Sequence, residues 1–258
     1  MTKLNLKKRL ILVTRPLPEG EVFCRLIDSC NGRFLLAPAL EIKPPTDPTP
    51  FLSAVKDIHV YNGIIITSAN GARALLEKLT PDMKVPPIFS VGKKTAEIIQ
   101  NAGYNSTTPS QPSGGIELAE SIKNWLPGGG RLLFPRAKKG REELVEILTS
   151  SGYQIDKVVA YQADPIKTLP KGVITALQNG EVDAIPFFSG RTAKAFLRAL
   201  PAQGSKWLAK PVIIAISKIT QETMEQDPII TINLVAKEAT AEGILKSLHS
   251  YWQNQNKK

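Results

Sequence analysis

Short apolar runs of strand length alternate with amphipathic, helix-like stretches along this chain of 258 residues. The apolar runs predict strands at Leu10–Thr14, Arg33–Ala37, Ile64–Thr67, Ile88–Val91, Leu132–Phe134, Lys157–Tyr161, Ala184–Phe188, Val212–Ile216 and Ile229–Leu234. Apolar residues three or four apart predict helices at Glu19–Ser29, Gly71–Leu79, Thr95–Ala102, Ile116–Trp125, Arg141–Ser150, Thr192–Leu200, Ile219–Glu225 and Ala241–Gln253. This alternation predicts an α/β fold of doubly wound parallel sheets, covered by helices on both faces.

The second half of the chain repeats the first. The turn Thr67-Ser68-Ala69-Asn70-Gly71 and the turn Phe188-Ser189-Gly190-Arg191-Thr192 each precede the same apolar spacing, at an offset of 189−68, or 121 residues. Arg15 and Arg136, each at the end of an expected strand, have the same offset of 136−15. A repeat of this length predicts two similar domains. We expect a ligand in a cleft between them, at the carboxyl ends of the strands.

Two extended segments, residues 38–45 and residues 158–165, occupy matching places in the two halves. If both cross between the domains, an inner domain of residues 39–164 is inserted into an outer domain of residues 1–38 and 165–258. The rival boundary is a tandem break near residues 127–130, where a proline precedes three glycines. We favour the insertion, because after a tandem break the first strand of the inner fold could not return to its own sheet.

The composition narrows the class of protein. Its longest apolar runs fall well short of the roughly 20 residues that span a bilayer, and the apolar run near the N-terminus, Leu10–Val13, is too short for a signal peptide. We therefore expect a cytoplasmic protein. Cys24 and Cys30 are poorly placed for a disulfide and are expected to be free thiols. With only two histidines, far apart, neither a metal site nor a Ser-His-Asp triad is expected.

The net charge of +10 admits three interpretations. A nucleic-acid partner is disfavoured, because no basic stretch carries interleaved aromatic residues or a known motif. A polyanionic small substrate explains the charge equally well. For most of the lysines, a solvated surface is the simplest interpretation.

Five hydroxyl-bearing turns lie after expected strands or before expected helices. Ser68 and Asn70 lie in one of them, Ser189 and Thr192 in its repeat partner, and the others lie at residues 91–95, 113–115 and 216–220. Each residue has a plain structural role as an N-cap, but a helix N-terminus also attracts anions. Five such turns on two domains predict a cleft that holds several carboxylates or phosphates.

Cationic residues and one tyrosine accompany these turns. Arg15, Arg136, Lys138, Lys139 and Arg141 follow strands or open helices. For Arg15, a binding role and a surface ion pair are equally open, whereas Lys138 and Lys139 are expected to be solvated. Tyr161, in the second linker, is either a buried residue whose hydroxyl needs a partner or a donor beside an anionic ligand.

Six motifs stand in a characteristic order along the chain. They are Thr14-Arg15-Pro16, the residues 67–74, Val91-Gly92-Lys93-Lys94-Thr95-Ala96, Val159-Ala160-Tyr161-Gln162, Phe187-Phe188-Ser189 and Ala215-Ile216-Ser217-Lys218-Ile219-Thr220. In their order and spacing the chain resembles the uroporphyrinogen-III synthase family over nearly its whole length. It departs from the family at Ser217, where glycine is usual, and at Gly190, where proline or alanine usually follows the serine.

The resemblance implies two flavodoxin-like domains joined by a two-stranded linker. It implies a hydro-lyase of porphyrin and heme biosynthesis, which cyclises the linear tetrapyrrole hydroxymethylbilane to uroporphyrinogen III with loss of water and inversion of ring D. No cofactor is expected. The substrate carries eight carboxylates, which suits a basic protein. Tyr161 matches the family's linker tyrosine and is the candidate catalytic residue.

Eight further residues are expected to bind the substrate. They are Arg15, Ser68, Asn70, Thr95, Ser113, Gly114, Ser189 and Thr220. We expect a monomer whose partner is a small molecule, with neither nucleic acid nor membrane involved. The alternative from a different class is a non-enzymatic two-domain sensor of an anionic metabolite, which would share the same turns.

Overall fold

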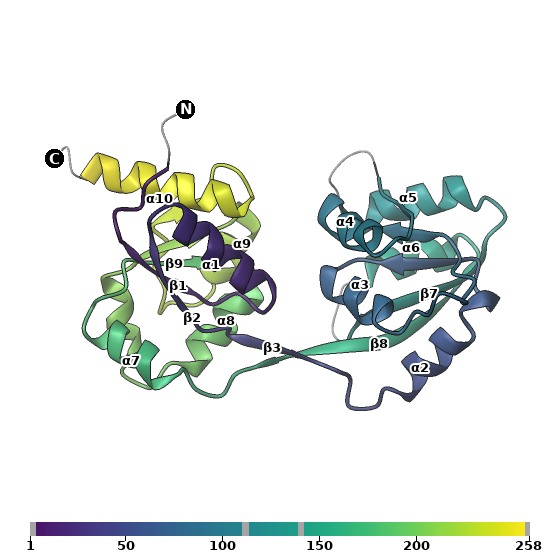
Figure 1. Ribbon diagram of the computed structural model, residues 1–258, viewed down its shortest axis with the longest axis horizontal. Coiled ribbons are helices and arrows are strands. Elements are labelled where there is room, and N and C mark those ends of the chain that lie inside the picture. The colour runs from purple at the N-terminus through teal and green to yellow at the C-terminus, as the bar shows by residue number, and fades with distance from the viewer. Residues whose placement is uncertain (1–3, 110–113, 139–141, 256–258) are drawn as a thin grey trace. The chain divides into compact units, whose positions relative to one another are not determined.

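The computed structural model describes residues 4–109, 114–138 and 142–255 (Figure 1). Its contacts divide the chain into two compact units. Unit 1 comprises Met1–Glu41 and Asp164–Lys258, and unit 2 comprises Ile42–Ala163. The chain passes from one unit to the other within β3 (Leu40–Lys43) and within β8 (Tyr153–Pro165). The sequence predicts these divisions after residues 38 and 164, on the basis of the two linker segments.

Unit 1 contains a five-stranded parallel sheet in the order β11-β10-β9-β1-β2. Its strands are β1 (Leu10–Val13), β2 (Arg33–Leu36), β9 (Ala184–Phe187), β10 (Val212–Ala215) and β11 (Leu234–Val235). Its helices are α1 (Glu19–Ser29), α7 (Lys171–Gln178), α8 (Gly190–Ala199), α9 (Lys218–Met224) and α10 (Ala241–Gln255), with a 3-10 helix η2 (Gly204–Ala209). Alternate residues of β1 face opposite sides: Leu10 and Leu12 pack with α7 and α8, whereas Ile11 and Val13 pack with α1 and α10.

Unit 2 repeats this construction. Its sheet has the order β3-β8-β7-β4-β5-β6, with the further strands β4 (Gly63–Ile66), β5 (Ile88–Ser90), β6 (Ser106–Thr107) and β7 (Gly130–Ala137). Its helices are α2 (Thr49–Lys56), α3 (Ala69–Leu76), α4 (Lys93–Asn101), α5 (Gly115–Trp125) and α6 (Glu143–Ser150), with a 3-10 helix η1 (Ile58–Val60). Ile64 and Ile66 pack on the side of α2, α3 and α4, and Ile65 packs on the side of α5 and α6. Both sheets are thus covered on both faces, and the predicted fold class is confirmed.

The two sheets are related by a circular permutation. Adding 121 to the bounds of β4, 63–66, gives 184–187, the bounds of β9. The strands β1 and β2 open unit 1, but β7 and β8, which hold the same places in the sheet, close unit 2. In each unit the direction of winding reverses beside one of the two equivalent strands β9 and β4. The reversal lies between β1 and β9 in unit 1 and between β7 and β4 in unit 2. Parallel α/β sheets bind ligands at such switch points.

Some predicted elements differ from the structure, and two helices were not predicted. The expected strand Ile229–Leu234 is a loop except at its end, because only Leu234 and Val235 pair with β10. The expected helix Gly71–Leu79 begins at Ala69 and ends at Leu76. Helices α2 and α7 were not expected, since each has eight residues and a proline at its start. Proline in a first turn is compatible with a helix, but it resembles a loop signal.

The packing of α8 against α9 explains one departure from the family. A Cβ at Gly190 would lie 2.2 Å from Thr223 Cγ2 and 2.6 Å from Thr223 Cβ. The Thr223 hydroxyl donates to the Ile219 carbonyl oxygen at 2.8 Å, which holds the threonine in this rotamer. Gly190 therefore permits a close approach that alanine or proline would prevent.

We predict that Gly190→Ala destabilises the protein by about 1–3 kcal/mol, the usual cost of overpacking a close contact. Gly172→Ala is the matched control, because that helical glycine has nothing within 4 Å of its missing Cβ. The control should raise stability by up to about 1 kcal/mol. Urea unfolding of both variants measures the difference. Equal stability of the two variants would contradict the proposed contact.

Candidate functional site

A pocket of about 300 Å³ opens at the carboxyl ends of the strands of unit 2. It is lined by Thr67, Val91, Gly114, Gly115, Phe134, Arg136, Ala137, Glu143, Leu144 and Tyr161. Thr67 directly follows β4, and Phe134, Arg136 and Ala137 end β7, so the pocket lies at the switch point of this sheet. Apolar walls with a few convergent polar groups are typical of small-molecule sites.

A β-bulge directs Tyr161 to this pocket. Strands β7 and β8 pair in step from Gly130 to Arg136, which stands opposite Val159, but Ala137 stands opposite Tyr161. The extra residue, Ala160, is buried. Because side chains alternate between the faces of a strand, one inserted residue changes the face on which the next side chain lies. Bulges recur beside active sites for this reason.

The Tyr161 hydroxyl is held by Ser68. Their oxygens are 3.0 Å apart, and Ser68 Oγ also accepts a hydrogen bond from the Gly71 N–H at 3.0 Å. Ser68 therefore caps α3 and anchors the tyrosine with one oxygen atom. Gly71 keeps this corner tight, since a Cβ there would lie 3.2 Å from the Pro135 carbonyl oxygen and 3.2 Å from Ser68 Oγ.

Arg136 is a cation of the pocket wall. The residue is only 7% exposed, and its Nη1 donates to Glu142 Oε1 at 2.8 Å. Its guanidinium carbon also lies 5.2 Å from the centroid of the Phe134 ring. Such a buried, always charged group is a natural partner for an anionic ligand.

Of the other predicted residues of unit 2, one lines the pocket and others lie in the first turns of helices. Gly114 lines the pocket and precedes α5. Asn70 lies in the first turn of α3, where its Oδ1 accepts from Arg73 Nη1 at 3.3 Å. Thr95 is buried in the first turn of α4, and its N–H donates to the Gly92 carbonyl oxygen. Ser113 lies outside the described residues.

Arg15, Ser189 and Thr220 belong to unit 1. Ser189 caps α8, where its Oγ accepts from the Thr192 N–H at 3.2 Å. Ser217 caps α9 in the same way through the N–H of Thr220, which is buried. The guanidinium of Arg15 lies 4.2 Å from the centroid of the Phe188 ring, and burial lowers the pKa of Arg15. At these two turns the N-cap role is thus met, and Arg15 stacks on an aromatic ring.

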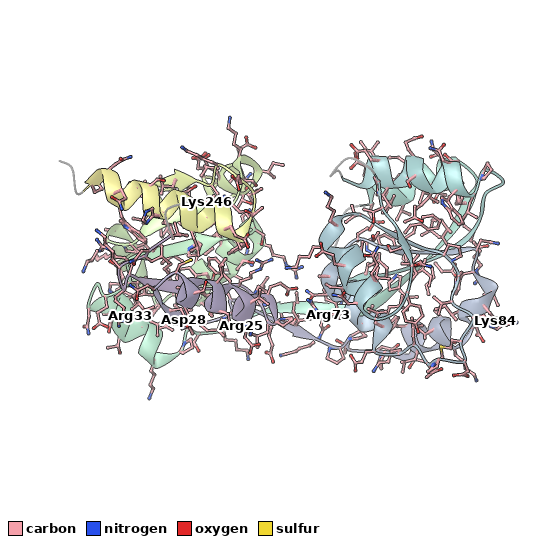
Figure 2. All side chains as sticks on the ribbon, turned by 45° about the horizontal axis from the view of Figure 1, so that its top comes forward. Arg25, Asp28, Arg33, Arg73, Lys84 and Lys246 are labelled. Atoms are coloured by element: carbon pink, nitrogen blue, oxygen red, sulfur yellow. The ribbon has the colours of Figure 1, made fainter. Side chains whose placement is uncertain are left out.

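Much of the positive charge is spread over the surface. Figure 2 shows the labelled side chains Arg25, Arg33 and Lys246 projecting from different elements, and all three are exposed. Within residues 4–109, 114–138 and 142–255, no group of three or more potential metal-ligating side chains gathers. No helix in that part of the chain is long and apolar enough to cross a membrane.

Comparison with known proteins gives one family. The model of the family described as "Uroporphyrinogen-III synthase HemD" matches residues 23–246. The chain belongs to the uroporphyrinogen-III synthase family. A uroporphyrinogen-III synthase of Synechococcus elongatus is 28% identical, over 93% of this chain and 94% of the relative. One of Chlorobaculum parvum is 26% identical, over 84% and 88%.

Solved structures share the fold. A mutant uroporphyrinogen III synthase of Thermus thermophilus matches with a TM-score of 0.60 at 18% identity, over 97% of this chain and 99% of the other. The enzyme of Helicobacter pylori also matches with a TM-score of 0.60, at 21% identity, over 93% and 97%. Together with the family match, these confirm the resemblance read from the motifs.

The pocket of this synthase-family chain contains residues that were not predicted to bind the substrate. The residues expected from the sequence to bind the substrate did not include Thr67, Phe134, Arg136, Glu143 and Leu144. A signal existed for Arg136, because the repeat pairs it with Arg15 at the offset of 136−15, or 121 residues. The structure gives this pairing a physical counterpart, since both arginines stack on a phenylalanine.

We predict that Ser68→Ala lowers the free energy of unfolding by about 1 kcal/mol, through loss of the N-cap. Thr240→Ala is the matched control: Thr240 Oγ1 accepts from the Gly243 N–H at 2.9 Å and caps α10. Its loss should cost a similar amount. Chemical denaturation measures both. Unchanged stability of Ser68→Ala would show that the oxygen serves Tyr161 and not the helix.

Proposed function

We propose that this chain cyclises hydroxymethylbilane to uroporphyrinogen III, with loss of water and inversion of ring D. The observation that carries the proposal is the anchored tyrosine of a synthase-family chain: the Tyr161 hydroxyl, held 3.0 Å from Ser68 Oγ, at the wall of the pocket. The conversion exchanges no electrons with a partner, because the substrate only loses water and closes a ring. No redox cofactor is required by this balance.

The pyrrole nitrogen of the substrate can itself expel the terminal hydroxyl group, which leaves an azafulvene electrophile. Tyr161 would donate a hydrogen bond to the departing oxygen and favour its loss as water. The substituted carbon of ring D then attacks to give a spiro intermediate, whose rearrangement inverts the ring. Holding the reacting carbons in place can supply a large part of the rate enhancement.

Ser68 governs the direction of the tyrosine proton. The serine oxygen already accepts from the Gly71 N–H. If its own hydrogen is donated to the tyrosine oxygen, the phenolic hydrogen is left to point into the pocket, toward a leaving group. In the opposite arrangement the tyrosine hydroxyl donates its hydrogen to the serine oxygen, and no phenolic hydrogen points into the pocket. We propose that the first arrangement is the active one, so that Ser68 acts through Tyr161.

The substrate carboxylates are proposed to bind to hydroxyls, N–H groups and cations at the helix-starting turns. Gly114 and Ser113 precede α5, and Asn70 and Thr95 lie in the first turns of α3 and α4. The contributions of Arg15, Ser189 and Thr220 of unit 1 to the same substrate stay a prediction. Helix N-termini and hydroxyl donors suit an octacarboxylate.

We infer further that the protein works as a monomer in the cytoplasm. Cys24 and Cys30 are free thiols, which fits a reducing compartment. A sedimentation measurement tests the monomer, and cell fractionation tests the location.

Incubating the protein with hydroxymethylbilane and separating the product isomers tests the function. The uncatalysed reaction closes the ring without inversion and gives the type I isomer. The proposal requires diversion to the type III isomer. If only type I forms, the chain is a binder of anionic metabolites and not a synthase.

We predict that Tyr161→Phe lowers kcat by tenfold or more. A positioned acid typically contributes about 10²–10⁴-fold to the rate. Ser68→Ala should lower kcat in the wild-type background and add little in the Tyr161→Phe background, because it acts through the same hydroxyl. Thr240→Ala, which removes a cap in unit 1, should leave kcat unchanged. Independent, additive losses in the double variant would refute a positioning role for Ser68.

A further inference from the structure

Arg136 and Glu142 form an unequal ion pair beside the pocket. The side chain of Arg136 is 8% exposed, whereas that of Glu142 is 47% exposed. The arginine lines the pocket wall at the end of β7. Glu142 stands at the start of α6, one residue before Glu143, which also lines the pocket. One member of the pair is thus fixed in the protein, and the other reaches it from the surface.

The guanidinium has more binding capacity than this pair uses. It offers five N–H donors and favours bidentate contact with a carboxylate. In the described part of the chain, one of these donors, Nη1, meets a carboxylate oxygen, Glu142 Oε1. A largely buried cation with a single-point contact to an exposed carboxylate is poorly compensated for its lost hydration. A ligand carboxylate that met two donors would compensate it better.

Glu142 has a second partner that can keep it in place. Lys157 Nζ donates to Glu142 Oε2 at 3.1 Å, from the adjacent strand β8. This hydrogen bond, together with Arg136, holds the pKa of Glu142 below its usual value, so the carboxylate is ionised near neutral pH. Lys157 is itself half-exposed. When Glu142 is displaced from Arg136, its charge remains paired with Lys157.

We propose that Arg136 is a binding residue for a carboxylate of the substrate, and that Glu142 occupies it in the free protein as an internal stand-in for that carboxylate. Binding then exchanges one carboxylate for another at a buried cation. The exchange avoids leaving Arg136 unpaired in the empty pocket, where an unpaired buried charge would be destabilising. It also makes the site selective, since a ligand without a carboxylate cannot displace Glu142. The inference rests on the proposed function, whose ligand is an octacarboxylate.

The same strand provides a matched control pair. Arg131, near the start of β7, donates from Nε and Nη2 to Asp156 Oδ2 at 3.0 and 2.7 Å. It also lies over an aromatic ring, Tyr61, as Arg136 lies over Phe134. Arg131 is 44% exposed and does not line the pocket. Both pairs join an arginine to a carboxylate, and they differ in the number of contacts, in burial and in position.

The test measures binding of uroporphyrinogen III by calorimetry without oxygen, and the Michaelis constant for hydroxymethylbilane, in four variants. For Arg136→Gln we expect both the dissociation constant and the Michaelis constant to rise by about tenfold or more, the value of a charged hydrogen bond. For Glu142→Gln we expect both constants to fall by about threefold or more, because the competing carboxylate is lost. Arg131→Gln and Asp156→Asn should stay within about twofold of the wild type. Arg136→Gln should also reduce the dependence of binding on salt.

Two outcomes would overturn the proposal. Wild-type affinity in Arg136→Gln would show that no ligand carboxylate reaches this arginine. Equal weakening in Arg136→Gln and Glu142→Gln would show that the pair only supports the structure, and because Glu142→Gln keeps the arginine, it stays informative if Arg136→Gln folds poorly. The isomer assay separates the two proposals: normal type III formation with an inert Arg136 refutes only this one. The expected affinity shifts without type III product would refute only the synthase.

Discussion

Both units depend on parallel sheets that are buried on two faces. A strand such as β4, Gly63–Ile66, has no exposed residue, because α2, α3 and α4 cover one side and α5 and α6 cover the other. Polar side chains are therefore disfavoured in the middle of such a strand, and most of them gather toward the strand ends. The carboxyl ends collect the turns, the helix N-termini and the pocket. The position of the site follows from where the sheet can tolerate a polar group.

The same turn serves different purposes in the two units. Ser68, Ser189 and Ser217 each cap a helix by accepting an N–H three residues ahead. In unit 1 the serine hydroxyls pair with the threonine of their own turn, Thr192 or Thr220. In unit 2 the Ser68 hydroxyl meets a tyrosine from another strand. A duplicated structural motif thus keeps its local role, while in one copy its spare hydrogen-bonding capacity holds a tyrosine of another strand.

The local features were predictable, and the long-range ones were not. The strands around Ile64 and Val212 and the serine caps were expected, because apolar runs and caps depend on neighbouring residues. The loop around Ile229 was mistaken for a strand, since an apolar run does not reveal whether a partner strand is within reach. The contact of Ser68 with Tyr161 joins residues 93 apart and depends on a bulge that no composition signals. Arg136 was visible through the repeat, but its burial and its pairing with Glu142 were not.

The two crossings of the chain are adjacent in the sheet, and this has a topological consequence. Strands β3 and β8, which contain both divisions between the units, are hydrogen-bonded neighbours. On the side of unit 1, the Ile166 N–H still donates to the Ala39 carbonyl oxygen at 3.1 Å. Unit 1 could thus be closed by a short turn from residue 39 to residue 166, and unit 2 begins and ends in paired strands. Each unit carries its own cores, so inserting one domain into the other at this point has little entropic cost.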